Sequence, residues 1–293
     1  MKRGSDIRVQ ARQNGMALVL VLWLVVLLSI MAAGHSRNVH TDTTLASRQV
    51  QSAKARALAE AGINHVILEM LAADPDRGLR ADGSVSRMRI GADEITIAVR
   101  DATGLVDLNA AIPELIDAAI EACNVNETAR RALVDAILDW RDKDDLAHLN
   151  GVEDDDYVAA GVAWTSRDGA FQSIDELRYL PGMSQALYDR LAPYVTVYSG
   201  RGGLNLEFAP PALVAALTGA EIPAVEADDA GGEPDGPRNG VFHIYASASG
   251  SSGTIAAIEA VVQISRKSKS PFTILDWREP PRAAFPPRRG VEG

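Results

Sequence analysis

The stretch that decides the fold is MALVLVLWLVVLLSIMAA, residues 16–33, which contains no charged side chain. As a helix it would be about 27 Å long, enough to cross the hydrocarbon core of one bilayer. The fifteen residues before it contain four basic side chains and one acidic side chain, a net charge of +3. The positive-inside rule therefore keeps this leader in the cytoplasm and places the rest of the chain outside.

Three interpretations of this N-terminus are open. A cleaved secretory signal has a shorter apolar core and a small-residue cleavage site, for which Ala32-Ala33-Gly34 is a weak candidate. A plain signal anchor would keep the whole segment. The third interpretation starts from Gly15, which lies at the junction of the basic leader and the apolar run and is followed at once by Met16.

This junction resembles the prepilin-type signal of type IV pilins and type II secretion pseudopilins. The resemblance implies that prepilin peptidase cuts between Gly15 and Met16 and methylates Met16, and that the apolar run begins a long helix. Most family members have glutamate at the fifth mature position, whereas this chain has Leu20. An apolar residue there is similar to the K-type minor pseudopilin. A membrane-buried glutamate is costly unless a charged group pairs with it, for instance the terminal amine of a neighbouring subunit. A subunit at the tip of a filament has no subunit ahead of it and therefore has less use for this glutamate.

Hydrophobic periodicity predicts the order of the elements. The long helix should continue to about residue 74, because residues 41–74 contain no proline and one glycine. Its apolar stripe would be Ile63, Val66, Ile67, Met70 and Leu71, at i, i+3, i+4, i+7 and i+8. Alternating patterns predict strands within 86–108, 241–246, 255–265 and 271–277. Helices are predicted at 113–123, 127–141 and 173–180.

This order implies an α+β head, and the resemblance implies a pseudopilin fold: a long N-terminal helix with a transmembrane start, an antiparallel sheet head and an inserted all-α domain. LNAAIPELIDAA (108–119) is similar to LEFAPPALVAAL (206–217), which suggests where the chain leaves the sheet and returns. The expected parts are a leader at 1–15, a transmembrane and stalk helix at 16–74, sheet at 75–109, the helical insertion at 110–203, sheet at 204–278 and a disordered tail at 279–293.

Residues 139–157, DWRDKDDLAHLNGVEDDDY, form a strongly acidic segment. A charge run alone is usually a solvated loop. Here three carboxylates lie close together where a helix ends, Asn150-Gly151 can turn sharply, and further carboxylates follow. Hard oxygen ligands converging from a loop suit Ca²⁺. Zinc is disfavoured because His148 is the only nitrogen ligand nearby, and the EF-hand frame fails at Leu146.

The pattern D-W-x-D-x-D followed by G-x-E-D-x-x-Y also resembles the K-type minor pseudopilin, whose helical insertion binds calcium. The resemblance implies a structural calcium role for Asp142, Asp144, Glu153 and Asp154, with Asp139 as a further candidate.

Residues 171–187 resemble a helix-hairpin-helix, which offers a rival function. Ser173 and Glu176 have the spacing of a capping box, Pro181-Gly182 would end the helix, and Ser184 would cap the next. The alternative protein is a membrane-anchored periplasmic DNA-binding protein. Electrostatics disfavour it, because residues 101–200 contain 7 basic and 19 acidic side chains and the whole chain has a net charge of −10.

No catalytic constellation emerges, since the five histidines are scattered and Cys123 is the only cysteine. A membrane-anchored calcium-dependent hydrolase would need a nucleophile and a base that the sequence does not offer. The resemblance implies a structural subunit and not an enzyme. Such a subunit would cap the type II secretion pseudopilus, with its head in the periplasm and a single pass through the inner membrane. Its expected partners are the I- and J-type minor pseudopilins, the major pseudopilin, prepilin peptidase and the inner-membrane secretion platform, with no nucleic acid.

Overall fold

The computed structural model describes residues 14–72, 80–217, 239–249, 255–265 and 268–280, and within these it leaves out the side chains of residues 14–16 and 32–44. The predicted leader up to residue 13, residues 223–238 of the Gly- and Pro-rich stretch, and the tail from residue 281 lie outside the described residues. The chain divides into two compact units, Met1–Ala53 and Lys54–Gly293.

Helix α1, Asn14–Ala72, begins in the first unit and ends in the second. In the first unit, all fifteen side chains from Ala17 to Met31 are exposed, although most are large and apolar. Within the described residues, no helix combines the length and the apolar character needed to cross a bilayer.

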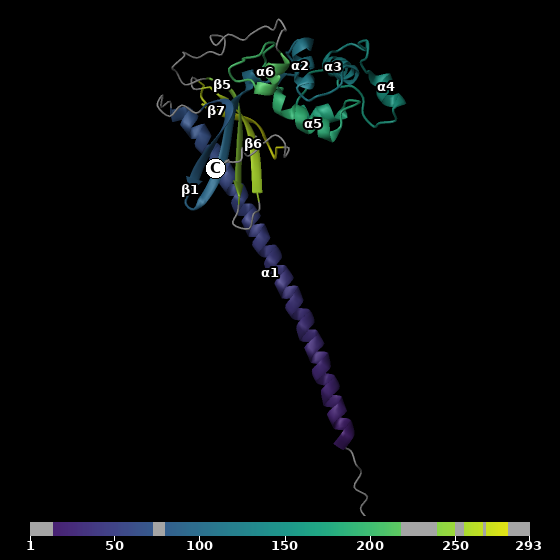
Figure 1. The fold of residues 1–293 in the computed structure, drawn as a ribbon, viewed down its shortest axis with the longest axis vertical. Helices are drawn as coiled ribbons and strands as arrows, with labels where there is room; N and C mark the ends of the chain where they lie inside the picture. The colour runs from purple at the N-terminus through teal and green to yellow at the C-terminus, as the bar shows by residue number, and fades with distance from the viewer. Residues whose placement is uncertain (1–13, 73–79, 218–238, 250–254, 266–267, 281–293) are drawn as a thin grey trace, which may run out of the picture. The chain divides into compact units, whose positions relative to one another are not determined.

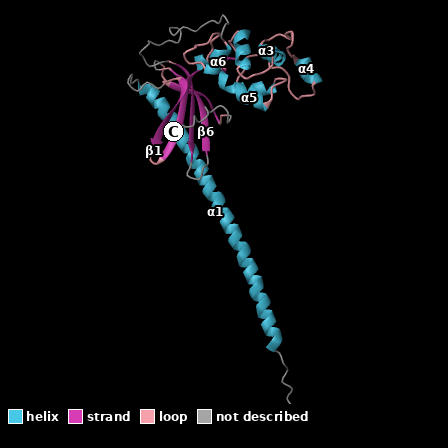
Figure 2. Ribbon diagram, viewed as in Figure 1, coloured by secondary structure: helices cyan, strands magenta, loops and turns pink. Residues whose placement is uncertain are grey.

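The head is built on a five-stranded antiparallel sheet in the order β1-β2-β5-β6-β7 (Figures 1 and 2). The strands are β1 Asp82–Ile90, β2 Asp93–Asp101, β5 Gly240–Ser249, β6 Ile255–Ile264 and β7 Phe272–Arg278. The predicted strands are confirmed, and the first begins four residues earlier than the alternating pattern indicated. Strands β1 and β2 form the hairpin expected at Gly91, which has a φ of 63°.

One face of the sheet packs against the C-terminal part of α1. The predicted stripe is confirmed: Ile63 and Val66 are fully buried, Ile67 is 4% exposed, and Met70 and Leu71 pack against the same core. The strands contribute every second residue to this core, among them Ile95, Ile97, Val99, Ile244 and Val262. The helix comes close to the sheet at Gly62, where an added Cβ would lie 3.0 Å from Ile95 Cγ2.

A mostly helical region lies between β2 and β5 and has its own apolar core. Its elements are η2 Ala102–Gly104, β3 Val106–Asp107, α2 Pro113–Glu121, α3 Glu127–Arg141, α4 Asp154–Ala159, η3 Ile174–Tyr179, α5 Gln185–Leu191, η4 Ala192–Tyr194, β4 Val195–Thr196 and α6 Pro211–Ala216. Two details differ from the expected all-α insertion. Strand β4 pairs in parallel with β3, and Leu204, Leu213 and Leu217 pack in the helical core, so the sheet resumes at Gly240 and not at residue 204.

Asp107 joins the two ends of this helical region. Its side chain is 1% exposed, and Oδ1 accepts hydrogen bonds from the N–H groups of Asn109 (2.9 Å) and Ala110 (3.2 Å). Oδ2 accepts from the N–H of Gly200 (2.7 Å) and the hydroxyl of Ser199 (3.0 Å). One buried carboxylate therefore holds together positions more than ninety residues apart in the chain.

A second buried carboxylate, Glu259, connects the sheet with the helical region. Its Oε1 lies 2.9 Å from His243 Nδ1, and its Oε2 accepts from Arg278 Nε at 2.9 Å. Because a carboxylate only accepts hydrogen bonds, Nδ1 donates and His243 Nε2 faces the Thr196 hydroxyl of β4 at 3.1 Å. Burial opposes ionisation, but His243 and Arg278 outweigh it and lower the pKa of Glu259 to about 2.

Glu259→Gln should destabilise the head by about 3 kcal/mol, because the half-buried guanidinium of Arg278 would keep only its longer ion pair with Asp276 at 3.7 Å. The depressed pKa means that the stabilisation is fully present above the ordinary value of 4.5 and is lost as pH falls from there to about 2. Urea unfolding followed by circular dichroism should show a steeper loss for the wild type than for the variant in that range. The exposed Glu207→Gln is the control, and equal stability of all three proteins would contradict the assignment.

Candidate metal centre in the acidic segment

Helix α3 positions the first carboxylates of the acidic segment. The helix starts behind Asn126, whose Oδ1 accepts a hydrogen bond from Ala129 N at 3.0 Å, and it ends at Arg141. Asp135, Asp139 and Asp142 follow at i, i+4 and i+7, which places them on one face. Asp142 is the first residue after the helix, with extended backbone angles, so the chain turns away from α3 at this carboxylate.

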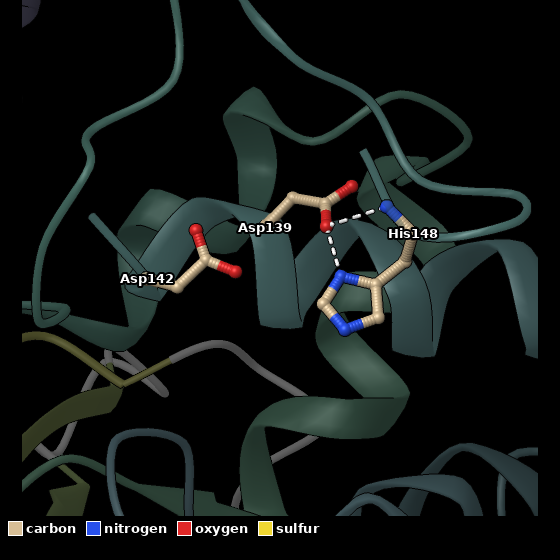
Figure 3. A group of neighbouring side chains, drawn as sticks. All are labelled: Asp139, Asp142 and His148. Carbon is tan, nitrogen blue, oxygen red and sulfur yellow. Dashed lines mark hydrogen bonds and ion pairs between the residues drawn. The ribbon is translucent and has the colours of Figure 1, made fainter. Parts of the chain in front are cut away.

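Asp139 is fully buried and organises the loop that follows (Figure 3). Its Oδ1 accepts from the backbone N–H of His148 at 3.1 Å and forms an ion pair with the ring Nδ1 of the same residue. Its Oδ2 accepts from Val152 N at 2.7 Å. The hydrogen bond to Asp139 raises the pKa of His148, although burial opposes this shift. Asp139 therefore acts as an anchor for the loop, with both oxygens already engaged.

The turn of this loop is fitted closely to α3. Asn150 donates to Asp135 Oδ2 twice, from its backbone N at 3.0 Å and its side-chain Nδ2 at 2.9 Å. A Cβ added to Gly151 would lie 1.7 Å from Asp139 Oδ2. The predicted Asn-Gly turn is therefore needed for a reason beyond backbone freedom, since Gly151 leaves the space that the buried carboxylate occupies.

Two other carboxylates have buried oxygens without hydrogen-bond donors. Among the described residues, nothing donates to Asp142 Oδ1 or Glu153 Oε1, and the buried hydroxyls of Tyr157 and Ser166 are also without partners. Glu153 is 8% exposed. A buried ionised oxygen with no donor is costly in a chain that folds around it. These oxygens would therefore be stabilised by a positively charged group.

Electrostatics indicate the same deficit of positive charge. Burial, with the nearby carboxylates of Asp139 and Asp142 adding to it, raises the pKa of Glu153 to about 7. Burial and the neighbouring Asp144 and Asp139 also raise the pKa of Asp142. The fixed cations of the segment do not compensate: Arg141 donates to the carbonyl of Leu108 at 2.7 Å, and the exposed Lys143 forms no ion pair with any described residue.

The structure brings some of the predicted ligands together and gives others a backbone role. Asp139, Asp142 and His148 each offer one atom within 4.8 Å of the other two (Figure 3). Asp144 Oδ1 accepts from Leu146 N at 3.1 Å, and Asp154 Oδ1 accepts from Ser166 N at 3.0 Å. The close group does not include Asp144, Glu153 or Asp154. The carboxylate oxygens of Asp142 and Glu153 that have no donor are hard ligands of the kind that calcium takes.

The sequence indicates His148 only as an isolated nitrogen ligand. Its position nine residues after Asp139, beyond a non-helical stretch, gives no periodic signal that would pair the two side chains. The contact arises because the loop folds back on α3, which neither charge pattern nor spacing reveals.

The helix-hairpin-helix prediction is confirmed in part. Ser184 caps α5, accepting from Leu187 N at 3.2 Å, and Gly182 has a positive φ of 81°. The capping box is wrong: Ser173 Oγ accepts from Asp175 N in a 3₁₀ helix. Glu176 instead accepts from Gln172 N at 2.9 Å and from Trp140 Nε1 at 3.1 Å.

The two predicted processing residues, Gly15 and Met16, lie in the first turn of α1. Their side chains are outside the described set. Processing therefore stays a prediction from the sequence.

Comparisons with known proteins place these features in one family. The model of type II secretion system protein K matches residues 99–200. Protein K of Klebsiella pneumoniae is 31% identical over 242 residues, covering 74% of this chain and 73% of the relative. Protein K of Aeromonas hydrophila is 27% identical over 245 residues, covering 75% and 74%.

A solved structure shares the fold. A chain of the GspK–GspI–GspJ complex from the type II secretion system of enterotoxigenic Escherichia coli superposes with a TM-score of 0.51. The match covers 82% of this chain and 99% of that chain, at 16% sequence identity. The mixed fold of helices and antiparallel sheet is therefore one that a known protein adopts.

Gly151→Ala should destabilise the chain by about 1–3 kcal/mol, because the added methyl group would overlap the Asp139 carboxylate and force the loop off α3. Gly169→Ala is the matched control: in the same helical region, the nearest atom to its added Cβ is 3.9 Å away. Urea unfolding at neutral pH measures both variants. Equal stabilities would show that the loop is not held by Asp139.

Proposed function

Because the chain belongs to the type II secretion system protein K family, we propose that it is the minor pseudopilin that caps the pseudopilus and helps to start its assembly. The family is a structural component of the secretion machinery and not an enzyme. The observation that carries the proposal is the match to protein K over three quarters of the chain, together with the shared fold. The expected neighbours are the I- and J-type minor pseudopilins, since the similar solved chain is part of a complex with GspI and GspJ.

The N-terminal segment would anchor this subunit in the inner membrane with its head in the periplasm. The uncharged run at 16–33 behind a basic leader supports this orientation. The exposed apolar side chains from Ala17 to Met31 also support it, since so long an apolar surface needs lipid or a partner helix to cover it. Cleavage after Gly15 would leave Leu20 at the fifth mature position. An apolar residue there needs no charged partner from a neighbouring subunit, which suits a subunit at the tip.

Calcium would stabilise the acidic segment of this subunit. The orphaned oxygens of Asp142 and Glu153 would be the first ligands, and Asp144 and Asp154 are the further candidates in the same acidic segment. Asp139 would hold the loop in place behind them, because its oxygens already accept three hydrogen bonds from the loop. A divalent cation would cancel the mutual repulsion of the carboxylates, which is what raises the pKa of Glu153 after burial.

Millimolar calcium should raise the melting temperature of the full chain in detergent, and chelation should reverse the rise. Asp142→Asn and Glu153→Gln should each reduce the rise, because these two side chains have the oxygens without donors. Asp142→Ala with Asp144→Ala should abolish it, because two carboxylate ligands are then lost. Asp155→Asn, an exposed carboxylate in the same run, should keep the wild-type response. Calorimetry with no calcium binding near millimolar would refute the site.

The tip role is tested by co-expressing the full chain with the I- and J-type minor pseudopilins and prepilin peptidase of the same secretion system. Extraction from membranes should recover a complex of all three minor pseudopilins, because each helix would bury its apolar stripe against the others. Intact-mass measurement of this chain should show a methylated N-terminus at Met16.

The controls separate the competing interpretations. An intact leader would favour a plain signal anchor, and a start near Ala33 would favour an ordinary secretory signal. Leu20→Glu should shift the chain from the tip to positions along the pseudopilus in labelled filaments, since it restores the residue typical of the other subunits. A correctly processed chain that does not associate with its two partners would refute the tip role.

A further inference from the structure

A cleft of about 410 Å³ lies where the sheet meets the helical region, on the face of the sheet opposite α1. From the sheet it is lined by Gly83, Arg100 and Tyr245, and from the helical region by Asp189, Arg190 and Tyr194. It shares no residue with the acidic segment. Its volume is in the range of sites that take small molecules or a few residues of a peptide.

Arg100 is the first unusual group in this cleft. Its Nη1 donates to the carbonyl of Phe208 at 2.6 Å, which fixes the guanidinium. Arg100 is half-buried, and burial lowers its pKa, whereas the carboxylate of its cross-strand neighbour Asp82 acts in the opposite direction. Asp82 does not come within ion-pair distance, so among the described residues no carboxylate pairs directly with the guanidinium. Partly buried arginines are stabilised by a direct carboxylate partner.

The site is shaped around this guanidinium. Gly83 has a φ of 81°, and an added Cβ would lie 1.9 Å from Arg100 Nη2. The strand β1 therefore passes directly over the guanidinium with no side chain between them. Arg100 is held in place by backbone on two sides and keeps its remaining donors for another group.

A second cation, Arg190, lines the same cleft from α5. It makes no hydrogen bond or ion pair with a described residue. The one carboxylate of the lining, Asp189, accepts from Gln185 Nε2 at 2.7 Å. The cleft therefore has an excess of one positive charge in a chain whose net charge is −10.

The remaining lining favours a chain segment over a free inorganic anion. Tyr194 and Tyr245 present aromatic surface beside the guanidinium of Arg100, and prolines 193, 210 and 211 form rigid apolar walls. Tyrosine and arginine together are the side chains most enriched where proteins bind peptides and other proteins. Asp189 would repel a polyanion such as a nucleic acid, but it would tolerate a single carboxylate placed between the two arginines.

We propose that this cleft binds an extended peptide segment of a partner protein and receives one acidic side chain of that segment between Arg100 and Arg190. The carboxylate pairs directly with the guanidinium groups, and the neighbouring residues of the segment pack on the tyrosines and prolines. This site is independent of the proposed place of the chain at the pseudopilus tip, because it rests only on the lining of the cleft.

The test uses the immobilised full chain in detergent and two pools of random decapeptides, capped at both ends, with either Glu or Gln fixed at the centre. Retained peptides are counted by mass spectrometry. The Glu pool should be retained about tenfold more than the Gln pool, as expected for one charge-assisted hydrogen bond. Arg100→Gln and Arg190→Gln should each remove most of this preference. Arg87→Gln, an exposed arginine of β1 paired with Glu94, should leave it unchanged.

Arg190→Gln keeps the test valid if Arg100→Gln impairs folding, because Arg190 is exposed and forms no hydrogen bond or ion pair with a described residue. Equal retention of the two pools by the wild type would overturn the proposal, as would a preference that survives in both variants. A third pool with a free C-terminal carboxylate and no acidic residue distinguishes the ligand. Stronger retention of that pool, or displacement of the Glu pool by millimolar inorganic phosphate, would mean that the cleft recognises a different anion.

Discussion

The burial of carboxylates is the constraint on which the rest of this structure depends. Asp107, Asp139 and Glu259 are each at most 1% exposed, and each is surrounded by N–H, hydroxyl, imidazole or guanidinium donors. A buried carboxylate that accepts several hydrogen bonds holds its donors strongly in place. In this chain the donors come from distant segments, so each carboxylate fixes a junction: the ends of the helical region, the acidic loop on α3, and the sheet against β4.

Asp142 and Glu153 depart from this rule and so stand out as candidates for ion binding. They are near Asp139 and on the same loop, but their buried oxygens have no donors among the described residues. The raised pKa of Glu153 expresses the same imbalance, since burial and its neighbours favour the protonated form. A carboxylate that organises the loop thus differs from a candidate ion ligand in having hydrogen-bond donors around its oxygens. The sequence does not reveal this difference, because all of these carboxylates belong to one acidic run.

Much of the fold was predictable because it depends on local periodicity. The α1 stripe at Ile63, Val66 and Ile67 and the alternating strands follow from the side-chain repeat of a helix and a strand. The contacts that sequence could not give are those between segments far apart: His148 on Asp139, Thr196 on His243, and Leu213 in the helical core. In each case several residues have the same local sequence pattern, and only the tertiary packing determines which of them makes the contact. The 3₁₀ helix after Ser173 differs for another reason, because Glu176 is drawn to Trp140 and is not free to cap.

The distribution of charge then bears on how such a subunit can associate. Residues 101–200 hold 19 acidic and 7 basic side chains, so this region repels other acidic surfaces at long range. Close approach must therefore rely on apolar surface, as along the first turns of α1, or on local cations that are not already neutralised. Most arginines of the region are paired, as Arg130 is with Asp117 and Glu121. Arg190 forms no ion pair with a described residue, although carboxylates are abundant in this region. Its charge is therefore available to a group on another molecule, which is the local attraction that an otherwise acidic surface needs.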